Sequence, residues 1–271
     1  MIKLLRSDLY RLFRSKAFYI CMIIYAVLIS GSAFLMNWSF KVIESNQEAI
    51  VGETITIQTT AETLFKDGIS YGISSLSDGT IQILLAIVIS IFITAEFSYG
   101  TMKNIVSKGY QRPKIYLSKL ITMVIMTLIM LIVGFLSGTI AVTIITGKLG
   151  TFTGTYLWEV MRVVGIETLL HIALASVFAM IAMVIRNNGG SIAGSIIGVS
   201  LFGTLIYQLL ELIFKNKVKF SQYSLQYNIG LYRLDIAPPM DDIIRSIIVG
   251  IAFLVLSTVI GIIAFKNTDI K

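Results

Sequence analysis

The sequence predicts an all-α membrane protein with six transmembrane helices, and three observations support this fold class. Of its 271 residues, 56% are hydrophobic and only 14% are charged, and the mean hydropathy is +0.85. Soluble domains are usually about half apolar, so few of them could bury this much apolar surface. Six apolar runs reach the roughly 20 helical residues that a bilayer core of about 30 Å requires. Strand-type alternation is absent from these runs, and backbone amides in lipid must be hydrogen-bonded internally, so the runs are expected to be helices.

The six runs follow one another along the chain, which we expect to form a single membrane domain over residues 1–271. The third run is longer than one crossing needs, so it is expected to tilt or to emerge from the lipid. The predicted spans are Ala17–Met36, Gly79–Ala95, Leu117–Thr146, Val160–Ile185, Gly189–Ile213 and Ile243–Phe265.

The distribution of charge near the span ends predicts that both termini lie in the cytoplasm. Lysine and arginine are concentrated before span 1, between spans 2 and 3 and after span 6, and these residues favour the cytoplasmic side. The connection 39–78 is mostly acidic and is expected to be extracellular. The connection 214–242 is expected to be extracellular or interfacial, although it carries four cations and only three aspartates. Cytoplasmic loops and anionic lipid account for the net charge of +7, so no nucleic-acid partner is expected.

Residues 1–16 predict an amphipathic helix that lies in the plane of the membrane. At about 100° per residue, apolar side chains gather on one face and cations lie opposite. The apolar face holds Ile2, Leu5, Leu9, Leu12 and Phe13, and the opposite side holds Lys3, Arg11 and Arg14. Such a helix would place its apolar face in lipid and its cations on phosphates. The alternative is a plain extension of span 1 whose charges only set the topology.

The cytoplasmic segment 96–114 predicts a short helix, parallel to the membrane, between spans 2 and 3. Glu96 suits a helix N-terminus, Gly109 is a natural C-cap, and Pro113 restarts the chain into span 3. One face is expected to gather Tyr99, Met102, Ile105 and Val106, whereas Lys103 and Lys108 point elsewhere. A helix held at both ends by membrane spans could fit a groove on a soluble partner. The alternative is an ordinary positively charged loop.

The fifth run contains a row of small residues, Gly190, Gly194 and Gly198, spaced four apart. Small residues at this spacing let another helix approach closely within lipid. The row therefore predicts either a seam with a second subunit or ordinary packing within the chain.

Glu167 and His171 lie four residues apart in the fourth run and share one helical face. An ionisable pair within a span is costly and is often functional, as a proton relay or as metal ligands. Two ligands do not complete a metal site, and a neutral histidine bonded to a glutamate is a satisfied structural pair. We favour the structural interpretation.

Three signatures of phosphate, metal or disulfide chemistry are missing from the sequence. It has no phosphate-binding G-x-x-x-x-G-K-[ST], no H-E-x-x-H and no cysteine pair. We therefore expect no enzymatic activity, no catalytic residue, no metal site and no cofactor in this chain.

Several of these residues resemble the membrane subunit of an ABC-2-type ATP-binding-cassette transporter. The resemblance is carried by Glu96-xxx-Gly100-Thr101, by Arg112 and by Lys119 at the start of the next span. The basic start KLLRSDLYRLFRSK and the ending Phe265-Lys266-xx-Asp269 extend it. It implies a permease that works with a second permease subunit, identical or paralogous, and with separate ATPase subunits that hold ATP and Mg. It also implies that the glycine row contributes to the dimer seam.

The resemblance further implies that segment 96–114 is a coupling helix that contacts the ATPase. The residues expected to couple are Glu96, Phe97, Tyr99, Gly100, Thr101, Met102, Lys103, Ile105, Lys108 and Arg112. Similar subunits handle bacitracin, lantibiotics and other amphipathic peptides, often in self-immunity. Export of an amphipathic peptide or lipid-like substrate across a bacterial cell membrane is therefore expected.

Two alternatives from other classes stay open. The first is an ion-coupled carrier or channel that acts alone, with Glu167 and His171 as its relay. The second is a non-transporting membrane sensor or immunity protein that binds peptide through residues 39–78.

Overall fold

The computed structural model describes residues 1–45, 65–199, 203–214, 219–233 and 238–267, and within them it contains helices and no strand. Five helices of this described part are long and apolar enough to cross a membrane. They are α2 (Lys16–Ser45), α5 (Gly79–Ser98), α7 (Arg112–Thr146), α8 (Gly154–Ile185) and α12 (Met240–Lys266). The predicted all-α membrane fold is confirmed, and the chain is a multi-pass membrane protein.

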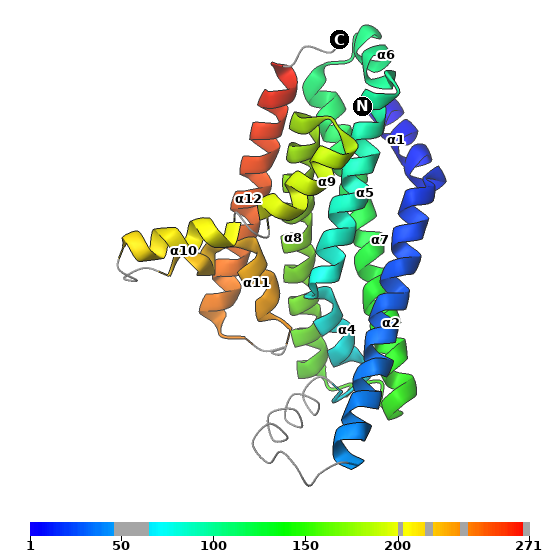
Figure 1. Ribbon diagram of the computed structural model, residues 1–271, viewed down its shortest axis with the longest axis vertical. Helices are drawn as coiled ribbons and strands as arrows, with labels where there is room; N and C mark the ends of the chain where they lie inside the picture. Colours follow the sequence, from blue (N-terminus) through cyan, green and yellow to red (C-terminus); the bar gives the residue numbers. More distant parts are fainter. Residues whose placement is uncertain (46–64, 200–202, 215–218, 234–237, 268–271) are drawn as a thin grey trace.

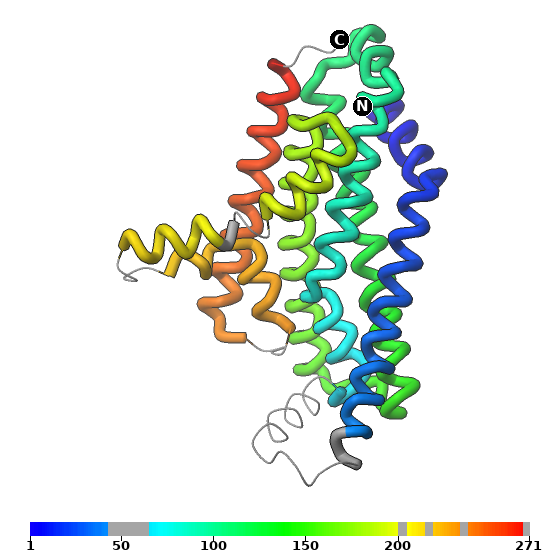
Figure 2. The backbone as a smooth tube through the Cα atoms, viewed as in Figure 1, coloured from blue at the N-terminus to red at the C-terminus, as the bar shows by residue number. Residues whose placement is uncertain are grey.

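The five long helices run side by side along the long axis of the molecule (Figure 1). α8 is central, because it packs on α5, α7, α9 and α12. One end of the bundle holds α1 (Ile2–Arg14), the short helix α6 (Thr101–Ser107) and the end of α12. The opposite end holds α4 (Gly68–Leu76), which leads into α5 after a break (Figure 2).

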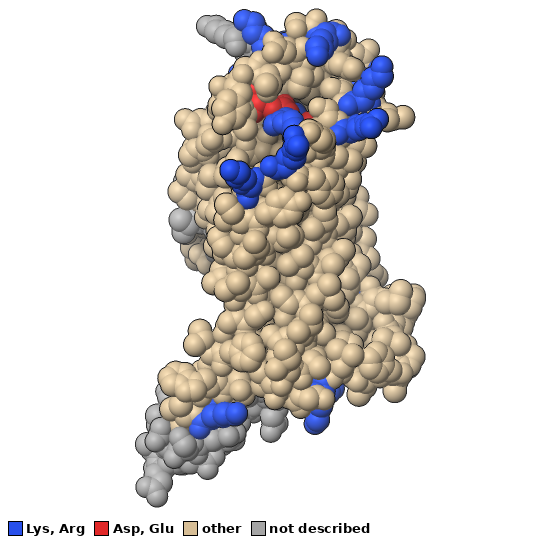
Figure 3. All heavy atoms as spheres, turned by 90° about the vertical axis from the view of Figure 1, so that its right-hand side faces the viewer, with Lys and Arg blue, Asp and Glu red and all other residues tan. Residues whose placement is uncertain are grey.

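Outward-facing side chains of the long helices are apolar and exposed, for example Leu28 on α2 and Ile248 and Val255 on α12. Soluble monomers rarely expose continuous apolar surface of this kind, whereas lipid accepts it. Figure 3 shows the face formed by α1 and α2, where the middle of the molecule carries almost no charge. Lysine and arginine side chains gather at the end that holds α1 and α6. This is the charge pattern of a membrane-crossing bundle with one basic end.

The prediction of one continuous span over Gly189–Ile213 is not confirmed. The structure instead describes α9 (Asn188–Ile197) and α10 (Gly203–Ile213), both too short for a single crossing. Figure 1 shows α9 on the side of the bundle, in the half that lies toward α6, while α10 stands out sideways at mid-height. Gly198 is the C-cap of α9 and Gly203 is the first residue of α10, and residues 200–202 lie outside the described part of the chain.

The two long connections contain helical structure that packs on the bundle. In the connection 39–78 the structure describes α4, and every residue of α4 is buried. In the connection 214–242 it describes the 3-10 turn Phe220–Tyr223 (η2) and α11 (Leu225–Leu231), which lies against α8 and α12. Asn228 of α11 accepts a hydrogen bond from Ser246 Oγ of α12 at 2.9 Å. The remaining parts of both connections, at 46–64, 215–218 and 234–237, lie outside the described residues.

Glycines allow α4 to approach α7 closely, and this contact leads to a prediction about stability. A Cβ added at Gly72 would meet Thr139 Oγ1 and would lie 2.9 Å from the carbonyl oxygen of Phe135. We expect Gly72→Ala to lower the free energy of unfolding by about 1–3 kcal/mol, because backbone must move to make room. The midpoint of thermal unfolding of the detergent-solubilised protein measures this effect.

Gly165→Ala is the matched control, because a Cβ added at Gly165 of α8 meets no atom within 4 Å. Its midpoint should stay unchanged or rise, since alanine favours the helix. Equal losses for Gly72→Ala and Gly165→Ala would contradict the close packing of α4 on α7.

Candidate functional site

A short helix, α6, joins α5 to α7 at the end of the bundle that also holds α1 (Figure 1). Gly100 precedes it with φ +66° and Gly109 follows it with φ +80°. An L side chain costs about 1–2 kcal/mol in this left-handed region, so glycine permits both sharp turns. A helix between α5 and α7 was predicted from the sequence, and it is present. Its bounds are narrower than 96–114.

The exposed side of this segment carries an aromatic ring and two cations. Tyr99 caps α5 and is 82% exposed, and Lys103 and Lys108 are also exposed. Met102 is buried, and Ile105 packs against the core. The expectation that Tyr99 shares the apolar face of Met102 is therefore wrong. Tyr99 belongs to the outward surface, because it lies in the turn before α6.

The two ends of the segment are joined to the end of α12. The ring of Phe97 meets the ring of Phe265 edge to face, with centroids 6.5 Å apart, and Arg186 of α8 lies over the Phe97 ring. Arg112 Nη1 donates to the carbonyl oxygens of Phe265 and Lys266, at 3.2 and 2.6 Å. Cations favour the carbonyl end of a helix. Phe97 and Arg112 thus fix the segment to the bundle.

Four charged side chains meet beneath α6, where α1, α5 and α7 converge: Asp8, Arg11, Glu96 and Lys119. We call them the ionic cluster. Lys119 Nζ lies 3.3 Å from Asp8 Oδ1 and 2.5 Å from Glu96 Oε1. Arg11 also pairs with Glu96, and Ser118 Oγ donates to Asp8 Oδ2 at 2.7 Å.

The ionic cluster contains two cations and two anions; Asp8, Glu96 and Lys119 are buried, and Arg11 is partly exposed. Glu96 is fully buried and Lys119 is 1% exposed. An unpaired ion at such a place would cost several kcal/mol, so the balance of charge is what makes the burial possible. Burial lowers the pKa of the Arg11 guanidinium, and the Asp8 carboxylate opposes that shift. Phe92 supports both cations, with Arg11 Cζ 5.2 Å and Lys119 Nζ 5.8 Å from its ring centroid.

Two expectations about these elements are corrected. Glu96 lies inside α5 and turns inward, rather than starting the short helix. On α1 the side that faces the bundle holds Leu4, Asp8 and Leu12, and Arg11 turns toward Glu96. Leu12 is therefore buried against protein rather than lipid, and Arg11, although partly exposed, pairs with Glu96. Asp8 was missed, although it is the one acidic residue within 1–16 and shares a face with Leu4 and Leu12.

The glycine row packs partly within the chain. A Cβ added at Gly190 or Gly194 would lie 2.9 or 2.8 Å from the Ile185 side chain of α8, whereas one at Gly198 would meet nothing within 4 Å. Gly190 and Gly194 thus allow α9 to pack closely on α8. The seam with a second subunit stays a prediction.

Glu167 and His171 form a fully buried polar pair in the middle of α8. His171 Nδ1 lies 3.3 Å from Glu167 Oε2 and 2.8 Å from the Glu167 carbonyl oxygen. Ser77 Oγ, at the junction of α4 and α5, donates to Glu167 Oε1 at 2.7 Å. Among the described residues no group of three or more His, Cys, Asp or Glu side chains could hold a metal ion. The hydrogen bond from Ser77 to Glu167 ties α8 to the break between α4 and α5.

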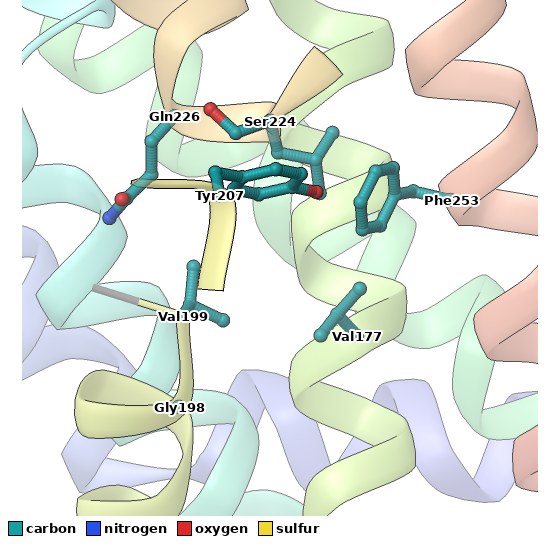
Figure 4. Close-up of a pocket in the computed structure, with 8 residues that line it drawn as sticks. Val177, Gly198, Val199, Tyr207, Ser224, Gln226 and Phe253 are labelled. Carbon is teal, nitrogen blue, oxygen red and sulfur yellow. The ribbon is translucent and has the colours of Figure 1, made fainter. Parts of the chain in front are cut away.

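Two cavities, of about 150 and 130 Å³, lie beside each other and share Val199 and Gln226. The first is lined by Val177, Gly198, Val199, Tyr207, Ser224, Leu225, Gln226 and Phe253. Figure 4 shows the Tyr207 ring between the Gln226 and Phe253 side chains, with the two valines facing the space below. The second cavity reaches Gln82 and Ile83 of α5. The walls are mostly apolar, with a few hydroxyl and amide groups.

The sequence from Gly68 to Gly72 reads G-x-S-x-G, a pattern typical of a nucleophilic serine at a strand-to-helix turn. The structure places it inside α4, where Ser70 Oγ lies 3.3 Å from Tyr156 Oη. Without the strand and the sharp turn, this serine has no exposed nucleophile geometry.

Comparison with known families gives one match over most of the chain. Residues 4–206 match the family described as "ABC-2 family transporter protein". The match begins in α1, includes α6 and all four residues of the ionic cluster, and ends in α10. No curated protein matches the sequence.

Proposed function

The chain belongs to the ABC-2 transporter family, and on this basis we propose that it is the permease subunit through which a separate ATPase drives export of an amphipathic substrate. As a member of this family, the chain is a membrane transport component that works with an ABC ATPase subunit. The proposal adds where that ATPase binds, what is transported and how the two are linked.

The observation that carries the proposal is the geometry of α6. The helix lies outside the bundle, and Tyr99, Lys103 and Lys108 present an exposed aromatic and basic surface. Its two ends continue into membrane-crossing helices, and Arg112 joins its end to α12. A soluble partner that binds this surface can therefore move α5 and α7 together.

In the proposed cycle, ATP closes the partner ATPases and displaces α6. The displacement changes the packing of α5 and α7 against α8 and opens a path for the substrate. Binding can shift such an equilibrium only through different affinities for its states. ATP and substrate must therefore each prefer one arrangement of the bundle.

The cavities beside Val199 support an amphipathic substrate over a small hydrophilic one. Their apolar walls suit acyl chains or aliphatic side chains, and Gln226 and Tyr207 offer polar groups at the edge. The second cavity lies against α5, so movement of α6 would alter its shape. We propose that a second permease subunit, identical or paralogous, completes the path, with the free side of Gly198 at the seam.

Gentle purification of the tagged chain from its native membrane tests the ATPase contact. We expect a P-loop ATPase to co-purify with the wild-type chain. Tyr99→Ala combined with Lys103→Glu should reduce its recovery about tenfold, because a loss of about 1.4 kcal/mol in binding has that effect. Quantitative mass spectrometry of the eluate is the measurement.

Lys16→Glu serves as the matched control, since Lys16 is exposed but lies at the start of α2 rather than on α6. Recovery should be unchanged with this variant. A monodisperse wild-type chain that brings no ATPase under mild conditions would refute the proposed function.

A further inference from the structure

We propose that α1 is a moving part of the coupling machinery, and that Asp8 and Arg11 are the positioning residues that hold it to the base of α6. The inference rests on the proposed function for its meaning, because it assigns α1 a share in the movement that α6 receives. Its structural basis, however, lies entirely in the contacts of the ionic cluster.

The first step is that the residues of α1 in the cluster contact the chain on both sides of α6. Glu96 lies in the last turns of α5, just before α6, and Lys119 lies in the second turn of α7, just after it. Asp8 and Arg11 of α1 contact these two residues directly. α1 therefore bridges the two helices that carry α6, at the point where each leaves the bundle.

The second step is that side chains, rather than the backbone, decide where α1 lies. Ser15 interrupts the helix between α1 and α2 with an extended ψ of 114°. Leu4 and Leu12 give α1 apolar contact with the bundle, and the polar contacts of its buried face are those of Asp8 and Arg11. Loss of these polar contacts would leave Leu4 and Leu12 to hold α1 against the bundle, with Ser15 as the point about which it can turn.

The third step concerns charge. α1 brings one anion and one cation, and α5 and α7 bring one each, so both halves of the cluster are neutral. Separating α1 would leave Glu96 and Lys119 paired only with each other at a buried site, because each of them would lose one ion-pair partner. Movement of α5 and α7 without α1 would therefore break two ion pairs.

The outer side of α1 connects this assembly to the membrane surface. Lys3, Arg6 and Arg14 are exposed there, beside the exposed side chains of Ile2 and Phe13. These exposed cations and apolar side chains suit a helix at the membrane surface, so movement of α6 would reach that surface through α1.

A double variant, Asp8→Asn with Arg11→Gln, separates this role from simple charge balance. It removes one anion and one cation, so Glu96 and Lys119 remain as a neutral pair at 2.5 Å. The amide oxygen introduced in place of the Asp8 carboxylate can still accept from Ser118. The variant should therefore assemble normally. Arg6→Gln is the matched control, because Arg6 is exposed on the same helix.

Amide hydrogen exchange of the purified chain, without any ATPase, is the first measurement. In the double variant we expect exchange in α1 and α6 to become about tenfold faster, while α8 stays unchanged. Arg6→Gln should match the wild type. Unchanged protection of α6 in the double variant would overturn the inference, whether or not an ATPase partner exists.

The second measurement uses the complex with its ATPase, trapped with ATP and vanadate. In the wild type we expect trapping to change exchange in both α6 and α1. In the double variant the change should be confined to α6, with basal ATP hydrolysis retained. A wild-type complex in which α1 does not respond would overturn the inference while leaving the proposed function intact.

If the double variant cannot be purified as a monodisperse protein, Arg11→Lys takes its place. It keeps the charge balance of the cluster but loses the forked guanidinium contact. Faster exchange in α1 and α6 would support the positioning role, and wild-type protection would refute it. Failure of any ATPase to bind the wild type would refute the proposed function alone, since the exchange of the isolated chain does not depend on it.

Discussion

Replacing Lys119 with methionine is expected to destabilise the fold by about 3–5 kcal/mol, because it breaks a buried ion pair by removing one partner. Lys119 is 1% exposed and its Nζ lies between the carboxylates of Asp8 and Glu96. Methionine fills a similar volume but leaves two buried carboxylates with Arg11 as their remaining cation. The expected result is loss of monodisperse protein after extraction, or a strongly lowered midpoint of thermal unfolding.

Two further substitutions make this test specific. Lys114→Met removes a lysine from the same helix at an exposed position, and it should leave the unfolding midpoint nearly unchanged. Lys119→Arg keeps the charge and should retain most of the stability, apart from the strain of a larger head group. Similar midpoints for Lys119→Met and Lys114→Met would show that the cluster contributes little to the fold.

The ionic cluster also shows where sequence reasoning reaches its limit. The sequence places Glu96 at the start of the cytoplasmic segment and Lys119 at the start of the next span, and the short helix between them is found where it is expected. Their partners on α1 lie far away in the chain, and no local pattern connects them. Asp8 sits within a basic stretch where topology explains the cations. Only tertiary packing brings its carboxylate to Lys119.

The prediction of one span over Gly189–Ile213 shows a different limit. Hydropathy reports only that a run is apolar enough for lipid, and this run satisfies that condition whether the chain is straight or bent. The sequence analysis treats the glycine row as a packing surface, and two of the glycines do pack on Ile185. The other five predicted spans correspond to the five long apolar helices of the described residues.

Removal of the Glu167 side chain is expected to have the second large effect, a loss of about 3 kcal/mol in the free energy of unfolding with Glu167→Ala. Ser77 would lose its acceptor at a nearly fully buried position, and His171 would lose the carboxylate while keeping the Glu167 carbonyl oxygen. The lost contact would also loosen the junction of α4 and α5 from α8. Thermal unfolding of the purified chain measures this effect, with Glu159→Ala, at a partly exposed position near the start of α8, as the control.

Glu167→Gln then separates the structural role of the pair from an ion relay. The amide oxygen can still accept from Ser77 and its nitrogen can still bond to an acceptor, so stability should change by less than about 1 kcal/mol. A structural pair predicts that transport of a dye-labelled amphipathic peptide into inside-out vesicles, in the presence of ATP, continues near the wild-type rate. A relay needs the ionisable carboxyl group, because an amide cannot release a proton. Abolished transport with normal assembly and normal ATP hydrolysis would therefore assign Glu167 to an ion path, and would make coupling through α6 alone insufficient to explain the transport cycle.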